Sequence, residues 1–188
     1  MRYVAVAEAG DLLREGRVGL VPTETVVGLV AGEAGLWRLF EVKCRDLDKP
    51  IAVLCGSAEE AFALGRAVPP LARSLADRFW PGPLTLVLQA EAGGTVGVRV
   101  PVHSVTRAVL ASHGSPFYAT SANPSGGSAP RALEEVGPAI SSNVDFAVRG
   151  EPGTGEASAV VDLSGGNVRL LRATKSLTED ELTRLSKG

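Results

Sequence analysis

The sequence holds few of the residues that build covalent frameworks or redox sites. Its 188 residues include two cysteines, two histidines and one methionine. Two cysteines cannot form a disulfide framework, and no pair of histidines lies near Cys44 or Cys55 to complete a set of zinc ligands. We therefore expect both thiols to be free, as is usual in a cytosolic protein.

Long apolar runs are also missing. No stretch approaches the ~20 residues that cross a membrane, and the N-terminal segment carries a charge every few residues, unlike a signal peptide. The charges nearly balance, with 19 Lys and Arg against 21 Asp and Glu, so no overall cationic field attracts nucleic acids or membranes. We expect a cytoplasmic protein without a membrane partner.

The composition is that of a globular chain, with 45% hydrophobic, 21% charged and only 5% aromatic residues. The length predicts one domain over residues 1–188 with an aliphatic core. Short runs rich in Val and Leu alternate with amphipathic segments of helical length, which predicts the α/β class with some parallel strand pairing. Strands are expected at 18–21, 51–54, 84–89, 96–100, 117–119, 146–148, 159–163 and 168–171, and helices at 9–15, 35–43, 70–79, 104–112 and from about Thr178.

The usual phosphate-binding and nucleophile motifs do not occur. The sequence contains neither a P-loop nor a glycine-rich dinucleotide fingerprint after a strand. His103 and His113 have no nucleophilic Ser or Cys motif near them, so a catalytic triad has little support. Four other segments place polar residues where a strand or helix ends, a common location for ligand sites in α/β proteins.

The first segment, residues 18–28, runs from an apolar strand into Pro22 and then into Thr23, Glu24 and Thr25. These three side chains carry oxygen acceptors at the end of the strand, where they can bind a ligand. Residue type favours a different interpretation, in which Thr23 caps a helix that contains Glu24. Capping and ligand binding are compatible.

The second segment ends a predicted helix with Lys43 and Arg45. Lys43 continues the apolar stripe of Leu36 and Leu39 at helical spacing, so it points inward and needs an anion, which a phosphate would supply. An equally supported alternative is that the two cations complement the helix dipole, with Lys43 extending to solvent.

The third segment, residues 95–101, is a strand with three valines on one face and Gly97 and Arg99 on the other. A guanidinium above a glycine floor can hold a carboxylate through two hydrogen bonds, whereas a solvated sheet face would make Arg99 an ordinary surface residue. The fourth segment, residues 117–127, opens a strand into hydroxyls, glycines and an amide, including Ser121 and Asn123. These groups suit phosphate or ribose oxygens, and a long turn also accounts for them.

Taken together and in this order, the segments resemble the YrdC/Sua5 family of threonylcarbamoyl-adenylate synthases, in its short, single-domain form. The resemblance covers nearly the whole chain and implies a single twisted open sheet of mixed strand direction with flanking helices. It rests on PTETVVGL at 22–29, Lys43 with Arg45, WPGPLTLVL at 80–88, VGVRVP at 96–101, ATSANPSG at 119–126 and the tail segments 155–163 and 170–172.

The resemblance implies a nucleotidyltransferase that joins L-threonine, bicarbonate or CO2, and ATP into threonylcarbamoyl-AMP and releases pyrophosphate. The product would serve the N6-threonylcarbamoyladenosine (t6A37) modification of tRNA through a transferase complex that acts downstream. A carbamate oxygen that attacks the α-phosphorus needs positioning and anion clamps more than a protein nucleophile. Mg2+ is implied on the ATP phosphates, held by phosphate oxygens and water rather than by protein side chains.

Site residues follow from the same resemblance, position by position. Thr25, Arg99 and Ser158 are expected to bind threonine, with Arg99 on its carboxylate. Lys43 and Arg45 are the expected catalytic pair, because they would neutralise phosphate charge and hold the departing pyrophosphate. The residues expected to bind ATP are Lys43, Arg45, Lys49, Thr95, Ser121, Asn123 and Arg172.

Five positions depart from the family's pattern, which has an aromatic, a histidine, an asparagine, a threonine and a glycine there: Val27, Leu54, Lys49, Ala159 and Ala173. These departures concern the acyl substrate more than the nucleotide, so a divergent paralogue with another carbamoyl or acyl substrate stays open. A second alternative is an RNA-binding protein without this activity. Its cationic surface would come from scattered arginines, namely Arg99, Arg107, Arg131 and Arg172.

Overall fold

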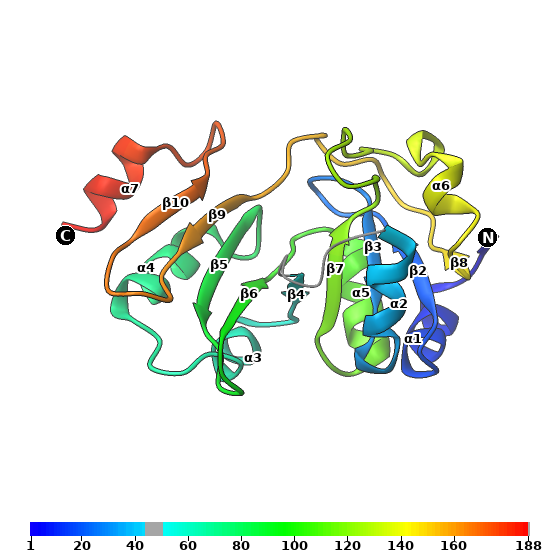
Figure 1. The fold of residues 1–188 in the computed structure, drawn as a ribbon, viewed down its shortest axis with the longest axis horizontal. Coiled ribbons are helices and arrows are strands. Elements are labelled where there is room, and N and C mark those ends of the chain that lie inside the picture. The colour runs from blue at the N-terminus through cyan, green and yellow to red at the C-terminus, as the bar shows by residue number, and fades with distance from the viewer. Residues whose placement is uncertain (44–50, 188) are drawn as a thin grey trace.

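The computed structural model describes residues 1–43 and 51–187 of the chain. Within these ranges the strands form one ten-stranded mixed sheet, in the order β1-β8-β2-β3-β7-β4-β6-β5-β9-β10. The sheet runs the length of the molecule, and the N- and C-termini lie at opposite ends (Figure 1). The predicted α/β class and the open sheet of mixed strand direction are confirmed.

Every predicted strand and helix is present, and the largest displacement of an end is at α1, which begins at Val6. The strands are β1 (Arg2–Tyr3), β2 (Val18–Val21), β3 (Gly28–Ala31), β4 (Ala52–Leu54), β5 (Leu84–Gln89), β6 (Thr95–Arg99), β7 (Phe117–Ser121), β8 (Phe146–Ala147), β9 (Ala159–Asp162) and β10 (Arg169–Arg172). The α-helices are α1 (Val6–Arg14), α2 (Leu36–Lys43), α3 (Ala58–Ala63), α4 (Pro70–Phe79), α5 (Ser104–His113), α6 (Pro138–Ser141) and α7 (Glu179–Leu185). Sequence patterns did not predict β1, β3, α3 and α6.

The interpretation of Thr23 as a helix cap is wrong. Residues 22–27 form an irregular loop that leads into β3, which pairs antiparallel with β2. Thr23 Oγ1 does accept the N–H groups of Thr25 and Val26, each at 3.2 Å. A threonine makes the same local hydrogen bonds in a turn as at the start of a helix. The loop is recognised as a turn only because the residues after it pair with β2 as a strand.

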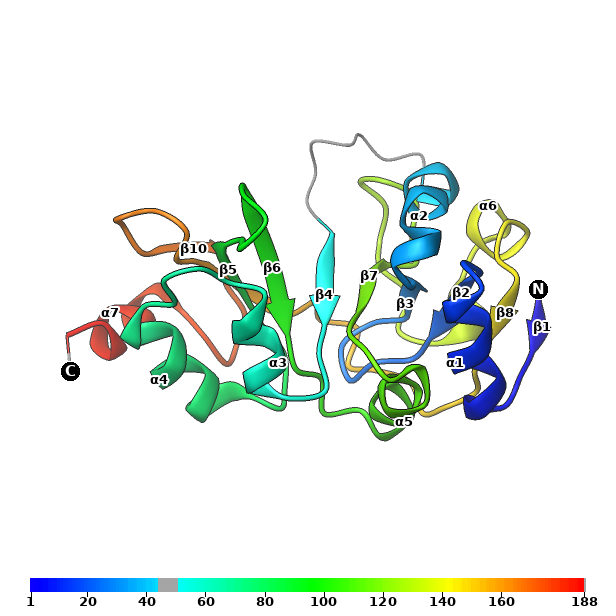
Figure 2. The same ribbon diagram turned by 90° about the horizontal axis from the view of Figure 1, so that it is seen from below.

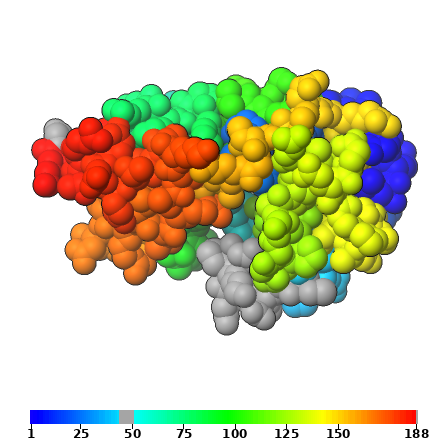
Figure 3. All heavy atoms as spheres, turned by 90° about the horizontal axis from the view of Figure 1, so that it is seen from above, coloured from blue at the N-terminus to red at the C-terminus, as the bar shows by residue number. Residues whose placement is uncertain are grey.

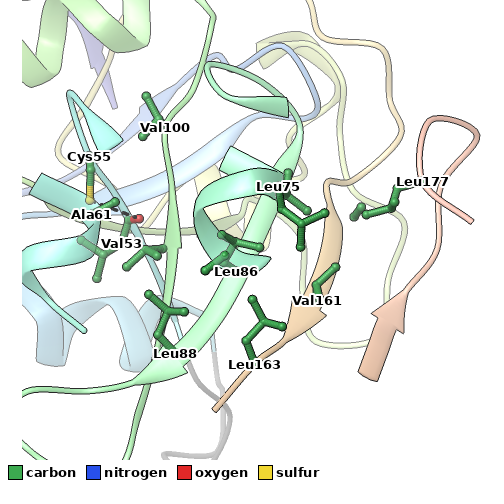
Figure 4. Packing of buried hydrophobic residues seen from close by; sticks show 14 of the residues in the cluster. Val53, Cys55, Ala61, Leu75, Leu86, Leu88, Val100, Val161, Leu163 and Leu177 are labelled. Carbon is green, nitrogen blue, oxygen red and sulfur yellow. Dashed lines mark hydrogen bonds between the residues drawn. The ribbon is translucent and has the colours of Figure 1, made fainter. Parts of the chain in front are cut away.

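The two faces of the sheet are covered differently. One face carries two apolar clusters, because α3, α4 and α7 pack over β5, β6 and β9, and α2 and α6 pack over β2 and β3. Figure 4 shows Leu86 and Val161 of the sheet beside Leu75 of α4. On the opposite face, α1 and α5 cover β2, β3 and β7, which leaves that face open over β6 and β5.

The helices also form two groups along the length of the sheet. In Figure 2, α3, α4 and α7 accompany β5, β6 and β10, whereas α1, α2, α5 and α6 gather around the strands near the N-terminus. None of the helices in residues 1–43 and 51–187 is long and apolar enough to span a bilayer.

A long connection, residues 148–158, carries the chain across the sheet from β8 to β9 (Figure 1). We call it the crossover segment. The backbone N–H of Thr154 donates to Glu24 O at 3.0 Å, and that of Gly155 donates to Thr25 O at 2.7 Å. Gly153 approaches so closely that a Cβ there would lie 2.4 Å from Thr25 O. The crossover segment therefore fixes the position of loop 22–27.

We predict that Gly19→Ala destabilises the fold. A Cβ at Gly19 would lie 2.3 Å from two atoms of the buried Phe146 ring, and such overpacking costs about 1–3 kcal/mol of the free energy of unfolding. Urea denaturation measures this loss. Gly165→Ala is the matched control, since nothing lies within 4 Å of a Cβ there, and equal stability of the two variants would contradict the packing of β2 against β8.

Candidate active site

A cavity of about 280 Å³ lies on the open part of the sheet, between loop 22–27 and the strands β4, β5, β6, β7, β9 and β10. Strand register explains its shape. Gly97 pairs with Ala52 and Val87, and Arg99 pairs with Leu54, so these residues share one face. Because Gly97 carries no side chain, the floor of the cavity is low at the centre. Figure 3 shows the surface hollowed between the orange β9–β10 region and the green-to-yellow segment that follows β7.

Five predicted site residues line this cavity, and each comes from a different part of the chain. Loop 22–27, β6, the end of β7, the crossover segment and the end of β10 contribute Thr25, Arg99, Ser121, Ser158 and Arg172, respectively. The mixed sheet brings these distant segments together, as the resemblance implied.

Arg99 is buried, with 7% of its surface exposed, so the surface interpretation of this residue is wrong. Its Nη2 donates to Glu24 Oε1 at 2.5 Å, Nη1 and Nη2 each donate to Thr25 Oγ1 at 3.1 Å, and Nε donates to Gly82 O at 3.2 Å. A guanidinium has five N–H groups, so these bonds leave one, on Nη1, for a ligand. A two-bond hold on a ligand carboxylate would require Glu24 or Thr25 to release Arg99.

The hydroxyl of Thr25 is also fully used. Thr23 donates its hydroxyl to Val26 O at 2.6 Å, so the 2.9 Å contact between the two threonine hydroxyls is a donation from Thr25. The Thr25 oxygen accepts from both Nη atoms of Arg99, which occupies its two lone pairs. Thr25 thus acts on the cavity by orienting Arg99.

A second guanidinium enters the cavity from β10. Arg172 donates through Nε to Ser158 O at 2.5 Å and through Nη2 to Ser158 Oγ at 3.2 Å. Partial burial is the main cause that lowers the pKa of Arg172, and the nearby positive charge of Arg99 lowers it further. Two guanidiniums that repel each other inside one cavity favour the binding of an anion between them.

Thr85 is a cavity residue that we did not predict. Its hydroxyl lies 2.9 Å from that of Ser158, and it lines the cavity beside Arg99. The signal was present in the alternation of β5, where Leu84, Leu86 and Leu88 enter the core and Thr85 takes the opposite face.

Lys43 points inward, with 4% of its surface exposed, so its predicted orientation is confirmed and its extension to solvent is excluded. Its Nζ donates to Thr120 Oγ1 at 2.8 Å, to Ser121 O at 2.6 Å and to Ser121 Oγ at 3.1 Å. Both partners line the cavity. The helix α2 that carries Lys43 packs on the opposite face of the sheet, so Lys43 does not line the cavity itself and contacts it through Thr120 and Ser121 at the end of β7.

Other predicted site residues lie apart from the cavity or outside the described ranges. Thr95 is exposed at the start of β6. Asn123 is buried and closes the following turn, donating to Pro124 O at 2.9 Å and Gly127 O at 2.6 Å. Neither is among the residues that line the cavity. Arg45 and Lys49 lie outside the described residues.

The departures from the family's pattern fall in different environments. Val27 is buried in the core cluster beneath α2 and Ala159 in the cluster around α4, so neither side chain faces the cavity. Leu54 lines it, so the absence of the family's histidine changes the wall of the cavity at this position.

Cys55 carries a free, buried thiol, as predicted. Burial, with a smaller effect of the nearby Glu60 charge, raises its pKa to about 12. At neutral pH this thiol is protonated and is a core side chain rather than a nucleophile. Cys44 lies outside the described residues.

A mixed α/β sheet with a hydroxyl-rich cavity that holds two guanidiniums defines a class of proteins that bind small anionic molecules. Comparison with known families makes this class specific. The sequence model of the Sua5/YciO/YrdC family, described as "Telomere recombination", matches residues 11–174. The chain belongs to this family.

Known relatives agree with this assignment. Over 177 residues the chain is 37% identical to the threonylcarbamoyl-AMP synthase of Pyrococcus abyssi. This match covers 87% of this chain and 52% of that protein. Over 181 residues it is 34% identical to the threonylcarbamoyl-AMP synthase of Bacillus subtilis, covering 89% and 52%. The crystal structure of P. abyssi Sua5 complexed with L-threonine matches with a TM-score of 0.87 and 33% identity, over 96% of this chain and 56% of that one. The chain thus spans about half the length of these relatives.

The ion pair of Glu24 and Arg99 predicts a pH dependence of stability. Burial acts to raise the pKa of Glu24, but the charge and hydrogen bond of Arg99 and backbone N–H groups outweigh it, so this pKa lies below its ordinary value of 4.5. A lowered pKa stabilises the fold above pH 4.5, and the contribution is lost as the pH falls through the folded-state pKa.

We therefore expect the free energy of unfolding to fall as the pH drops from about 5 through the folded-state pKa of Glu24, and to fall less steeply in Glu24→Gln. Urea denaturation of both proteins across this range measures the difference. Parallel curves for the two proteins would show that the ion pair contributes nothing to folding.

Proposed function

We propose that this chain is a threonylcarbamoyl-AMP synthase, a nucleotidyltransferase that uses L-threonine, bicarbonate or CO2, and ATP. The observation that carries the proposal is the cavity that holds Arg99 and Arg172 in a chain whose curated relatives bear this name. The L-threonine complex of P. abyssi Sua5 supports threonine as one substrate.

The cavity suits the charges of this reaction. Threonine's amino group and bicarbonate give a carbamate and water, and one oxygen of the carbamate attacks the α-phosphorus of ATP while pyrophosphate leaves. The carbamate, the triphosphate and the carboxylate of threonine are all anionic. Fixed cations such as Arg99, Arg172 and Lys43 stabilise the charge that accumulates during phosphoryl transfer, and no protein nucleophile is needed.

Mg2+ fits this site as the ATP complex. The carboxylate of Glu24 is bound to Arg99, and the described part of the chain brings no three His, Cys, Asp or Glu side chains together as a metal site. We propose that phosphate oxygens and water hold the ion, as is common for Mg2+ at nucleotides. The ion would shield phosphate charge, while Arg172 and Lys43 bind the phosphates.

The product would pass to a downstream transferase complex that modifies tRNA. The RNA-binding alternative has less support, because its surface needs exposed arginines. Arg99 is buried against Glu24, and the exposed Arg131 pairs with Glu135 at 3.2 Å.

The direct test is to incubate the purified protein with ATP, Mg2+, bicarbonate and L-threonine, and to detect threonylcarbamoyl-AMP by rapid mass spectrometry together with pyrophosphate. We expect product that requires all three substrates. Adenylate formed without threonine would favour a paralogue with another acyl substrate, and ATP binding without turnover would reject the synthase function.

Loss of the Lys43 charge should slow the reaction. We expect Lys43→Met, which keeps the apolar stem, to lower the rate of pyrophosphate release by about 100-fold, with unchanged circular dichroism. Arg45→Ala should have a similar effect if the two cations act together. Lys187→Ala, at an exposed position, is the control, and wild-type rates in Lys43→Met would remove Lys43 from the catalytic pair.

A further inference from the structure

Glu24 lies behind the cavity rather than in it. Its side chain lines a smaller cavity of about 160 Å³, and Thr25 and Ala157 line both cavities and separate them. Glu24 therefore acts on a ligand in the larger cavity through Arg99, whose Nη2 it accepts at 2.5 Å. A residue in this place can orient a binding group without touching the ligand.

Four of the five N–H groups of the Arg99 guanidinium donate to other residues of the protein. Glu24 and Thr25 take both hydrogens of Nη2, Thr25 takes one hydrogen of Nη1, and Gly82 O takes the hydrogen of Nε. The remaining N–H is on Nη1, and Arg99 lines the larger cavity. The guanidinium thus presents one defined donor instead of a freely turning fork.

Glu24 is itself held firmly by three separate segments. Its Oε2 accepts the backbone N–H of His103, at the start of α5, at 3.3 Å. Its backbone carbonyl accepts the N–H of Thr154 in the crossover segment at 3.0 Å. The carboxylate is therefore held between β6 and the start of α5, and the crossover segment holds the backbone of the same residue.

We propose that Glu24 is a positioning residue for the substrate carboxylate: it holds Arg99 so that one Nη1 N–H binds that carboxylate. This inference rests on the proposed function, which supplies L-threonine as the substrate. The competing interpretation is that Glu24 occupies Arg99 and must be displaced by the substrate. The two interpretations predict opposite changes in affinity for the substrate, because removal of a positioning group weakens binding and removal of a competitor strengthens it.

The test is calorimetric titration of wild type, Glu24→Ala and Glu24→Gln with L-threonine, with L-threoninol, which lacks the carboxylate, and with ATP. We expect Glu24→Ala to weaken L-threonine binding by about tenfold. Glu24→Gln should lose less, since its amide oxygen still accepts from Nη2, and it keeps the test valid if the alanine variant fails to fold. Binding of L-threoninol and of ATP should be unchanged.

Glu8→Ala is the matched control, because Glu8 also pairs with an arginine, Arg2, at 2.6 Å, but on the surface. Unchanged or tighter L-threonine binding in the Glu24 variants would overturn the proposal. An equal loss for L-threonine and L-threoninol would also overturn it, since a positioning role acts through the carboxylate. Failure of wild type to bind L-threonine would instead reject the proposed function, and the inference with it.

Discussion

The site depends on the buried guanidinium of Arg99, whose positive charge needs a partner inside the protein. Arg99 stays charged at any physiological pH, and a buried charge without a partner is costly. Glu24, Thr25 and Gly82 together meet that requirement. Because these partners sit on loop 22–27 and on the turn before β5, the neutralisation of one charge also fixes the loop, the strand β6 and the cavity between them.

The position of the cavity follows from how the sheet is covered. Helices cover one face over most of the central strands, while α1 and α5 protect only part of the other. The uncovered part can accept hydroxyls and cations without burying them in an apolar core, so polar residues concentrate there. Lys43 contacts two of these residues, Thr120 and Ser121, from the opposite face, because α2 ends beside the last residues of β7.

Local periodicity predicted much of this arrangement. Alternation in β6 put Gly97 and Arg99 on one face, and the helical stripe of Leu36 and Leu39 turned Lys43 inward, as observed. Sequence-based prediction failed where one side chain can make the same hydrogen bonds in two different local structures. Thr23 makes the hydrogen bonds of a helix cap although no helix follows it. Thr85 was missed for a different reason: threonine is common in strands, so its place on the polar face of β5 did not mark it as a site residue.

The sequence by itself determined the fold class, the main strands and helices, the inward direction of Lys43 and the shared face of Gly97 and Arg99, because periods of 2 and 3.6 residues are local properties of the chain. Only the tertiary structure decided which partner each charge takes. Glu24 and Arg99, or Lys43 and Ser121, are far apart in sequence and meet through sheet pairing and the crossover segment. Those contacts depend on long-range geometry, and they, rather than the residue types, set how many donors the site offers to a ligand.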